Sequence, residues 1–187
     1  MKYLIIGLGN IGDKYINTRH NIGFAILDAL AKASNVVFED KRYGFIGEMP
    51  YKGRKYLLLK PSTFVNLSGR AVQYWIKKKK IPHENILVVV DDVALPFGVL
   101  RLKKRGGDGG HNGLLHISQV LGTQYYSRLR FGIGSEFSQG TKVKFVLGEW
   151  AENEASILVD RINIACDIIK SFGFHGVDQT MNTFNNK

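Results

Sequence analysis

Hydrophobic positions along the chain form two kinds of pattern: short continuous runs, which predict buried strands, and residues at helical spacing, which predict helices. The two kinds follow one another along the chain. Ile86–Val90 is a continuous β-branched and leucine run, which is typical of a strand buried on both faces. Tyr3–Ile6 is a similar run near the N-terminus. Between about Asn21 and Ala33, apolar residues recur at helical spacing, which predicts an amphipathic helix. Strands interleaved with helices favour an α/β architecture.

The same two kinds of pattern predict the remaining elements. Arg42–Glu48 and Lys55–Leu59 are expected to form a hairpin-like pair around the turn at Lys52-Gly53-Arg54. Further strands are predicted at Val99–Lys103, Arg128–Ile133 and Lys142–Leu147, and further helices at Ser68–Lys78, Gly113–Leu121 and Ala151–Phe172. Ser68 is expected to cap its helix, and Gly122 and Gly173 to end the two later ones.

These elements predict a fold of the α/β class: a single-domain three-layer sandwich with a twisted mixed β-sheet flanked by helices. The hairpin-like pair is the reason to expect a mixed sheet rather than a wholly parallel one. No repeat, low-complexity stretch or linker divides the chain, so we expect one catalytic domain over residues 1–187.

Composition narrows the class of protein. The chain has 187 residues, of which 44% are hydrophobic and 22% charged, as in ordinary soluble globular proteins. No apolar run is long enough to span a membrane, and the N-terminus does not resemble a secretory signal. The single cysteine, Cys166, excludes an internal disulfide and a multi-cysteine metal site, and its apolar neighbours place it in the core. These features predict a cytoplasmic protein.

The net charge changes the picture most. Twenty-six Lys and Arg residues against 16 Asp and Glu give a net charge of +10, which favours a polyanionic partner such as nucleic acid. Lys77–Lys80 is more typical of a solvated helix end. Charge therefore indicates a class of partner and no particular one.

The glycines at Gly7-Leu8-Gly9-Asn10-Ile11-Gly12 follow the first strand and match the G-x-G-x-x-G pattern of dinucleotide-binding proteins. That pattern requires a helix that begins at the glycines, and here eight residues, 13–20, separate them from the helical period. It also requires an acidic residue about 20 positions further on, whereas Glu39-Asp40 lies later than that. A tight turn that allows close backbone packing is therefore the better interpretation.

The residues after these glycines carry chemistry. Polar groups gather on one predicted loop at the end of a strand: Asn10, Tyr15, Thr18, Arg19, His20 and Asn21. His20 titrates nearest neutrality among them, so it is a candidate general base, although a structural histidine is the commoner outcome for a lone His. Asp91 and Asp92 end the buried strand, and one of them could orient a neutral histidine. A cap or turn residue remains the alternative for this pair.

A basic, glycine-rich loop follows the strand at Val99–Lys103. Residues 101–113 combine cations with flexible backbone ahead of a helix N-terminus, which suits phosphate. Arg128 and Arg130 alternate on the next strand and could add to this site. The chain lacks the sequence motifs of serine hydrolases, P-loop proteins and zinc proteases. A histidine and a carboxylate without an evident nucleophile or metal set indicate direct attack by water.

Several motifs, in order along the chain, together resemble the bacterial peptidyl-tRNA hydrolase family. These motifs are spread over nearly the whole sequence. They are Gly7–Gly12 with Tyr15, Thr18–Phe24, Lys60–Gly69, Asp91–Gly98, Gly109–Gly113, Arg128–Gly134, Phe145–Gly148 and Met181-Asn182. The resemblance implies a monomeric, cofactor-free enzyme without a metal. Such an enzyme cleaves the ester between a peptide and the 3′ ribose of tRNA, and thereby recycles tRNA from aborted translation.

The resemblance also implies roles for individual residues. His20 would activate water, and Asp91 rather than Asp92 would assist it. Asn10 would face the peptide and help to separate blocked from free aminoacyl-tRNA. The 3′ end of the tRNA would be held by Tyr15, Phe64, Asn66 and Asn112, and its 5′-phosphate by Lys103 and Arg130.

The chain departs from the usual family pattern at Ile11, Val65, Val90 and Ala94, where Pro, Met, His and Asp are more frequent. None of these changes removes a group that the chemistry needs. Two alternatives stay open: a catalytically silent relative that binds structured RNA, and a nucleotide-dependent oxidoreductase. Ester cleavage of peptidyl-tRNA, or titration with a nicotinamide dinucleotide, distinguishes them.

Overall fold

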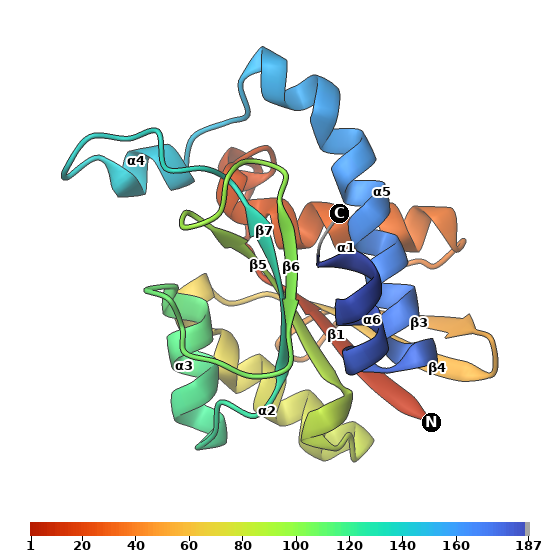
Figure 1. Cartoon of the computed structure of the whole chain (residues 1–187). Helices are drawn as coiled ribbons and strands as arrows, with labels where there is room; N and C mark the ends of the chain where they lie inside the picture. Colours follow the sequence, from red (N-terminus) through yellow and green to blue (C-terminus); the bar gives the residue numbers. More distant parts are fainter. Residues whose placement is uncertain (186–187) are drawn as a thin grey trace.

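The fold is organised around a mixed sheet of seven strands in the order β2-β3-β4-β1-β5-β7-β6. The computed structural model describes residues 1–185 (Figure 1). The strands are β1 (Lys2–Gly7), β2 (Glu39–Lys41), β3 (Gly44–Tyr51), β4 (Arg54–Pro61), β5 (Ile86–Asp92), β6 (Leu100–Lys103) and β7 (Ser127–Gly132). The α-helices are α1 (Ile22–Ala33), α2 (Ser68–Lys79), α3 (Asn112–Leu121), α4 (Lys142–Val146), α5 (Glu152–His175) and α6 (Val177–Phe184).

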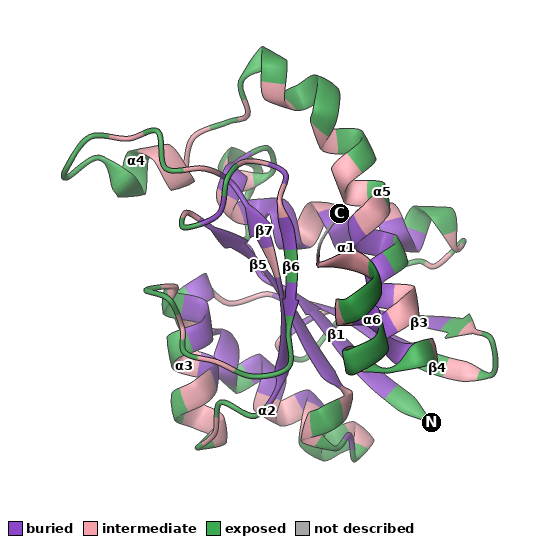
Figure 2. Ribbon diagram, in the orientation of Figure 1, coloured by how far each residue is buried: buried purple, intermediate pink, exposed green. Residues whose placement is uncertain are grey.

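The central strands are buried because helices cover both faces of the sheet. Alternate residues of β1 and β5 enter two separate apolar clusters: Ile5 and Val89 pack with α1 and α5, whereas Ile6 and Val88 pack with α2 and α3. Figure 2 shows these strands buried along most of their length. The three-layer α/β sandwich expected from the sequence is confirmed, and so is the hairpin of β3 and β4, which pair antiparallel.

The sheet brings four strand ends to one edge. Strands β4, β1, β5 and β7 are neighbours and run parallel. Their carboxyl ends therefore lie side by side, which is where open α/β sheets place their sites. Asn10 follows β1, Asp91 and Asp92 end β5, and the α4 region follows β7, so residues far apart in sequence meet there.

The glycines near the N-terminus serve close packing rather than a cofactor turn. A Cβ atom at Gly7 would lie 2.3 Å from the carbonyl oxygen of Gly23, and one at Gly23 would lie 2.5 Å from backbone atoms of Leu8. Helix α1 thus crosses β1 at backbone contact distance. As expected, α1 begins only at Ile22, after short 3₁₀ turns at Asp13–Tyr15 and Arg19–Asn21.

Three predictions about local structure were wrong. The strand expected at residues 142–147 is instead helix α4, Lys142–Val146, because this segment lies outside the sheet and no strand in the described part of the chain is available to pair with it. Helix α5 continues through Gly173, which is buried against the ring of Tyr56, and ends before Gly176. Ser68 is the first residue of α2 rather than its cap, and its hydroxyl donates to the carbonyl of Val65.

The exposed edge of the sheet is closed by helix α6, which the sequence did not predict. Asn185 follows α6, and its side-chain amide both accepts from the backbone N–H of Leu102 and donates to the carbonyl of Leu102, at 2.8 and 2.9 Å. The amide therefore takes the place of a neighbouring strand at the centre of β6. Among the helices of residues 1–185, none combines the length and apolar character needed to cross a bilayer.

The contact between α1 and β1 makes Gly23 a sensitive position. Replacing Gly23 by Ala should destabilise the protein by about 2–3 kcal/mol, because the added methyl meets backbone atoms that cannot move aside. Urea unfolding measures this loss. Gly107→Ala is the matched control, since a Cβ there meets nothing within 4 Å. Equal stabilities of the two variants would contradict the proposed packing.

Candidate active site

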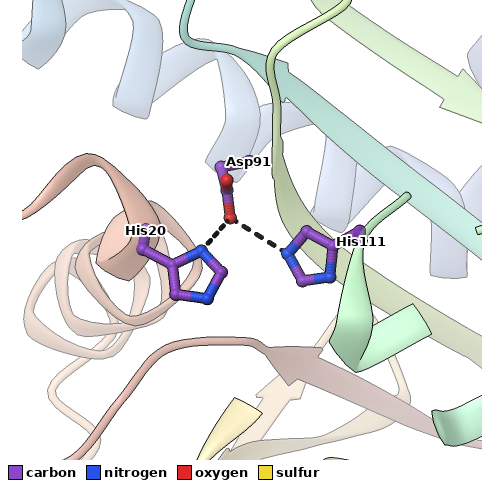
Figure 3. Close-up of side chains that lie close together, drawn as sticks. All are labelled: His20, Asp91 and His111. Carbon is purple, nitrogen blue, oxygen red and sulfur yellow. Dashed lines mark hydrogen bonds and ion pairs between the residues drawn. The ribbon is translucent and has the colours of Figure 1, made fainter. Parts of the chain in front are cut away.

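Asp91, on β5, is the centre of the site. Its side chain is only 5% exposed, and one oxygen, Oδ1, accepts hydrogen bonds from two histidines (Figure 3). His20 Nδ1 lies 2.8 Å from this oxygen and His111 Nε2 lies 3.0 Å from it. A carboxylate buried at the end of a strand needs such donors to remain ionised. The structure therefore brings together the histidine and the carboxylate that the sequence singled out.

His20 is held in a short 3₁₀ turn, Arg19–Asn21, directly before helix α1. The imidazole is 15% exposed, so one side faces the protein and the other faces solvent. Because Nδ1 donates its hydrogen to Asp91, the other ring nitrogen, Nε2, carries the lone pair. His20 thus presents an acceptor of protons while its opposite nitrogen is fixed by the carboxylate.

His111 is fixed in the complementary way. Its Nδ1 accepts from the backbone N–H groups of Gly113 and Leu114, at 3.1 and 3.4 Å, in the first turn of α3. The hydrogen must therefore reside on Nε2, where it is donated to Asp91. One imidazole thus caps a helix and supplies the second hydrogen bond to the buried carboxylate.

The charges of this group shift the pKa values of its members. Burial alone would lower the pKa of His20, but the charge of Asp91 and the hydrogen bond to it outweigh burial and raise the pKa above its ordinary value of 6.5. Burial alone would raise the pKa of Asp91, and the adjacent His111 and His20 instead hold it well below its usual range. Asp91 is therefore ionised, and the hydrogen between the two groups stays on His20 Nδ1.

By residue type, His20, Asp91 and His111 could also bind a metal, since one ligand atom from each lies within 4.8 Å of the others. The hydrogen bonds oppose this. Nδ1 of His111 already accepts from two backbone N–H groups, so Nε2 carries the hydrogen and has no lone pair for an ion. A metal at Nε2 would require this imidazole to give up its cap on α3. The donor set fits a proton-transfer site better than a metal site.

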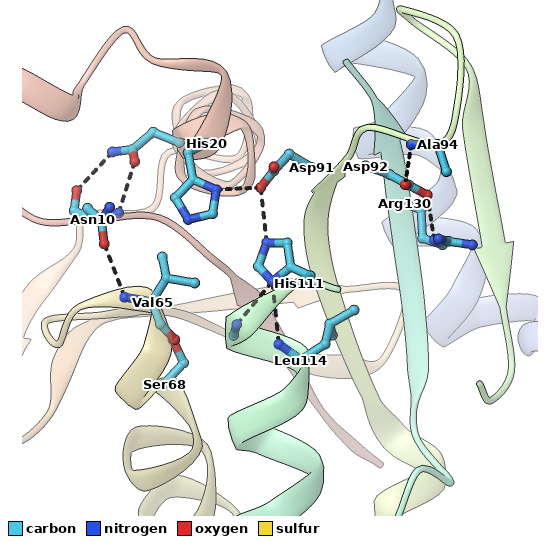
Figure 4. A network of polar contacts seen from close by, with 12 residues as sticks. Asn10, His20, Val65, Ser68, Asp91, Asp92, Ala94, His111, Leu114 and Arg130 are labelled. Atoms are coloured by element: carbon cyan, nitrogen blue, oxygen red, sulfur yellow. Dashed lines mark hydrogen bonds and ion pairs between the residues drawn. The ribbon is translucent and has the colours of Figure 1, made fainter. Parts of the chain in front are cut away.

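Asn10 enters the site from the loop after β1. Its side-chain oxygen accepts from the backbone N–H of Val65 at 3.1 Å, which leaves the amide hydrogens on the other side (Figure 4). Asn21 fixes the backbone of Asn10, since its side chain bonds both the N–H and the carbonyl of that residue at 2.9 Å. Asn21 is therefore a support for the loop that carries Asn10.

A cavity of about 550 Å³ opens over these groups. Its walls include Asn10, His20, Phe64, Asn66, Asp91, His111, Asn112, Arg130, Lys142, Val143, Val146 and Leu147. Phe64, one of these wall residues, is 55% exposed. Seven of the nine residues predicted from the sequence for the site line this cavity, and α4 supplies a wall that the sequence assigned to the sheet.

Arg130 lines the cavity on the side of the glycine-rich loop. Its Nε lies 2.6 Å from Asp92 Oδ2, and its Nη2 lies against Gly109. Asp92 also accepts from the backbone N–H of Ala94 at 2.8 Å, so it fixes a turn as well as an arginine. Nζ of Lys142 lies close to the same loop, next to Gly110. Two cations from different elements thus meet at this loop.

Two predicted residues lie apart from the cavity. Among the described residues, those that line it do not include Tyr15 or Lys103. Tyr15 is in the 3₁₀ turn before His20, with the ammonium group of Lys14 4.9 Å from the centre of its ring. Lys103 is exposed at the end of β6. Its partner in register is Arg128 on β7.

Arg128 cannot add to a phosphate site, contrary to expectation. Its side chain is buried, with a residue exposure of 1%, and stacks on the ring of Tyr126. Its guanidinium donates to the backbone carbonyls of Gly106, Gly107, Gln124 and Tyr126. Arg128 therefore holds the glycine-rich loop in place, while Arg130, two residues later, reaches the cavity.

Sequence reasoning missed His111 as part of the charged group. A usable signal was present: a second histidine in the loop of residues 109–113, directly before a predicted helix. The cations and glycines of that loop favoured phosphate binding, so its histidine was not considered as a partner of Asp91.

Comparisons with known proteins identify the family of the chain. The model of the peptidyl-tRNA hydrolase family matches residues 4–187. The chain is 60% identical to a peptidyl-tRNA hydrolase of Phocaeicola vulgatus and 58% identical to one of Bacteroides fragilis, with all of each chain covered. It superimposes on the crystal structure of a peptidyl-tRNA hydrolase from Acinetobacter baumannii with a TM-score of 0.92 at 37% identity, covering 98% of this chain and 94% of the other. This chain is a member of the peptidyl-tRNA hydrolase family.

Proposed function

We propose that the protein hydrolyses the ester between a peptide and the 3′ ribose of tRNA, with His20 as general base and Asp91 as the group that holds its basic form. The observation that carries this proposal is the contact of 2.8 Å between His20 Nδ1 and Asp91 Oδ1 at the floor of an open cavity. The membership of the chain in the family supports the same reaction.

The reaction needs only a modestly activated water. His20 Nε2 removes a proton from water as the oxygen attacks the ester carbonyl carbon, and Asp91 stabilises the imidazolium that forms. The carbon–oxygen bond to the ribose then breaks, and the proton passes to the departing 3′ oxygen. The products are a peptide acid and a tRNA with a free 3′ hydroxyl. His111 holds Asp91 in place through the second hydrogen bond.

Neutral amides are suited to the remaining roles. The amide hydrogens of Asn10 are left free by its bond to Val65, and Asn66 and Asn112 line the same cavity. Such donors can stabilise a developing oxyanion, each worth about 3–4 kcal/mol in a preorganised site. Asn10 lies in the loop after β1 and lines the cavity, and we assign it to the peptide part of the substrate.

Cations on two neighbouring strands, one lining the cavity and one beyond it, suit the tRNA. Arg130 and Lys103 lie on neighbouring strands β7 and β6, and we assign them to phosphate. Tyr15, Phe64, Asn66 and Asn112 are assigned to the 3′ end. We propose further that residues 1–187 act as one catalytic domain, as a monomer and without a cofactor. We also assign the protein to the cytoplasm, because a single buried cysteine fits a reducing compartment.

The direct test is hydrolysis of an N-blocked aminoacyl-tRNA by the wild type and by His20→Ala. The variant should lose about 10²–10⁴-fold in kcat, because the general base is removed. His83→Ala is the control, since His83 precedes the opposite end of the same strand, β5. Undiminished turnover by His20→Ala would contradict the assignment. Binding of tRNA by the wild type without any cleavage would favour the silent RNA-binding alternative.

The charge of Asp91 should be visible in the titration of His20. In the wild type, the pKa of His20 lies above 6.5, so kcat/KM should rise with pH and level off above that pKa, where the base is neutral. Asp91→Asn keeps the shape but removes the charge, so burial should then lower the pKa below 6.5. NMR titration of the imidazole measures both values. His116, whose pKa burial lowers, should titrate unchanged in the two proteins. An equal His20 pKa in both would contradict the coupling.

The cations assigned to phosphate should control the dependence of binding on salt. Lys103→Ala and Arg130→Gln should each reduce the slope of log K against log salt by about 1, because each removes one phosphate contact. Gln is used at position 130 because it can still donate to Asp92. Lys77→Ala, on the exposed end of α2, should leave the slope unchanged. Slopes that stay at the wild-type value in the first two variants would contradict their assignment.

A further inference from the structure

Arg19 is a charged residue with an unusual degree of burial. It stands next to His20 in the same 3₁₀ turn, and only 9% of it is exposed. The family resemblance assigns it no role, and it does not line the cavity. A buried guanidinium is costly unless its donors are satisfied and its charge is paired. The partners of Arg19 therefore show what its burial achieves.

All of these partners lie in one distant segment of the chain. The guanidinium donates to the carbonyls of Glu149 and Phe145, at 2.6 and 3.4 Å, and pairs with Glu154 at 2.7 Å. It lies over the ring of Phe145, 4.4 Å from the centroid. The backbone takes part as well, since the N–H of Arg19 donates to the carbonyl of Gly148 at 3.0 Å.

The segment that Arg19 holds is one wall of the cavity. Lys142, Val143, Val146 and Leu147 line the cavity, and the carbonyls bound by Arg19 belong to residues 145, 148 and 149. In Figure 1, α4 projects away from the sheet, and its last two residues, Phe145 and Val146, are partly buried against the core. Glu154 also accepts from the N–H of Ala151, which joins the start of α5 to the same arginine.

We propose that Arg19 is a positioning residue that ties the α4 wall of the cavity to the turn that carries His20. One side chain fixes the wall, and the adjacent residue is the imidazole that faces Asp91. The wall that touches the substrate and the base that activates water are thereby held as one unit. This inference rests on the proposed hydrolysis for its kinetic consequences, and on contacts alone for its structural ones.

A merely structural role would have a different consequence. An arginine that only stabilised the fold would lower the fraction of folded protein and leave the kinetic constants of the folded molecules unchanged. An arginine that only held the wall would affect KM. The coupling of wall and base requires that both kcat and KM change in folded protein.

The test compares the wild type with Arg19→Met, which keeps an unbranched apolar side chain and removes the charged guanidinium. Using an N-blocked aminoacyl-tRNA and a concentration corrected for folded protein, we expect kcat to fall at least about tenfold and KM to rise about threefold or more, since small misplacements of reacting groups are costly. Arg19→Lys keeps a charge opposite Glu154 and should recover part of both changes. Values within about twofold of the wild type, or a change in KM alone, would overturn the proposal.

Tyr56→Phe is the control for a general loss of packing. It removes a hydrogen bond to the carbonyl of Lys170 in α5, far from the cavity wall, and should leave kcat and KM unchanged. If Arg19→Met does not fold, Arg19→Lys decides the question alone: a folded Lys variant with wild-type constants would refute the coupling.

A second measurement does not depend on activity. Hydrogen exchange should be faster in Arg19→Met at the amides of Phe145, Leu147 and Gly148, and the NMR signals of the His20 ring should shift in the same variant. Faster exchange without a change at His20 would show that wall and base are independent. If the wild type did not cleave the substrate at all, the proposed function would fail, whereas these two readouts would still judge the role of Arg19.

Discussion

The arrangement of the site depends on one buried negative charge, that of Asp91. A carboxylate at the end of a strand buried on both faces must be satisfied by hydrogen bonds, and two imidazoles supply them to a single oxygen. This requirement fixes the tautomer of each histidine. His20 is left with a free nitrogen toward the cavity, and His111 is left with a nitrogen that caps a helix. His20 and His111 thus have different roles because both donate to the same oxygen of Asp91.

The carboxylate of Asp91 can act on His20 only because the backbones of α1 and β1 approach one another closely. Gly7 and Gly23 allow α1 to lie against β1, and this contact places the turn of His20 next to the end of β5. The glycines that resemble a cofactor motif therefore determine where the base lies. Their role in the site is indirect and rests on packing, since Asn10 and His20, and not the glycines, face the cavity.

Much of this arrangement could be predicted from the sequence. The periods of β1, α1 and β5 are strong because these elements are buried, and their ends gave His20, Asp91 and Asn10 as candidates. The wrong prediction at residues 142–147 has a physical cause: a short alternating segment suits a strand only where a partner strand is available, and that depends on the tertiary structure. The roles of His111, Arg19 and Arg128 share this cause, since each is defined by partners remote in sequence.

Arg128 and Arg130 are the same residue type on one strand, and their different surroundings give them different roles. The two arginines are two residues apart on one strand, yet only Arg130 reaches the cavity. Arg128 forms no ion pair with any of the residues 1–185, and its guanidinium is bound to carbonyls alone. Its positive charge is consequently not neutralised by contact with a carboxylate. It contributes a permanent electrostatic potential beneath the glycine-rich loop, which attracts a polyanion at a distance without ever touching it.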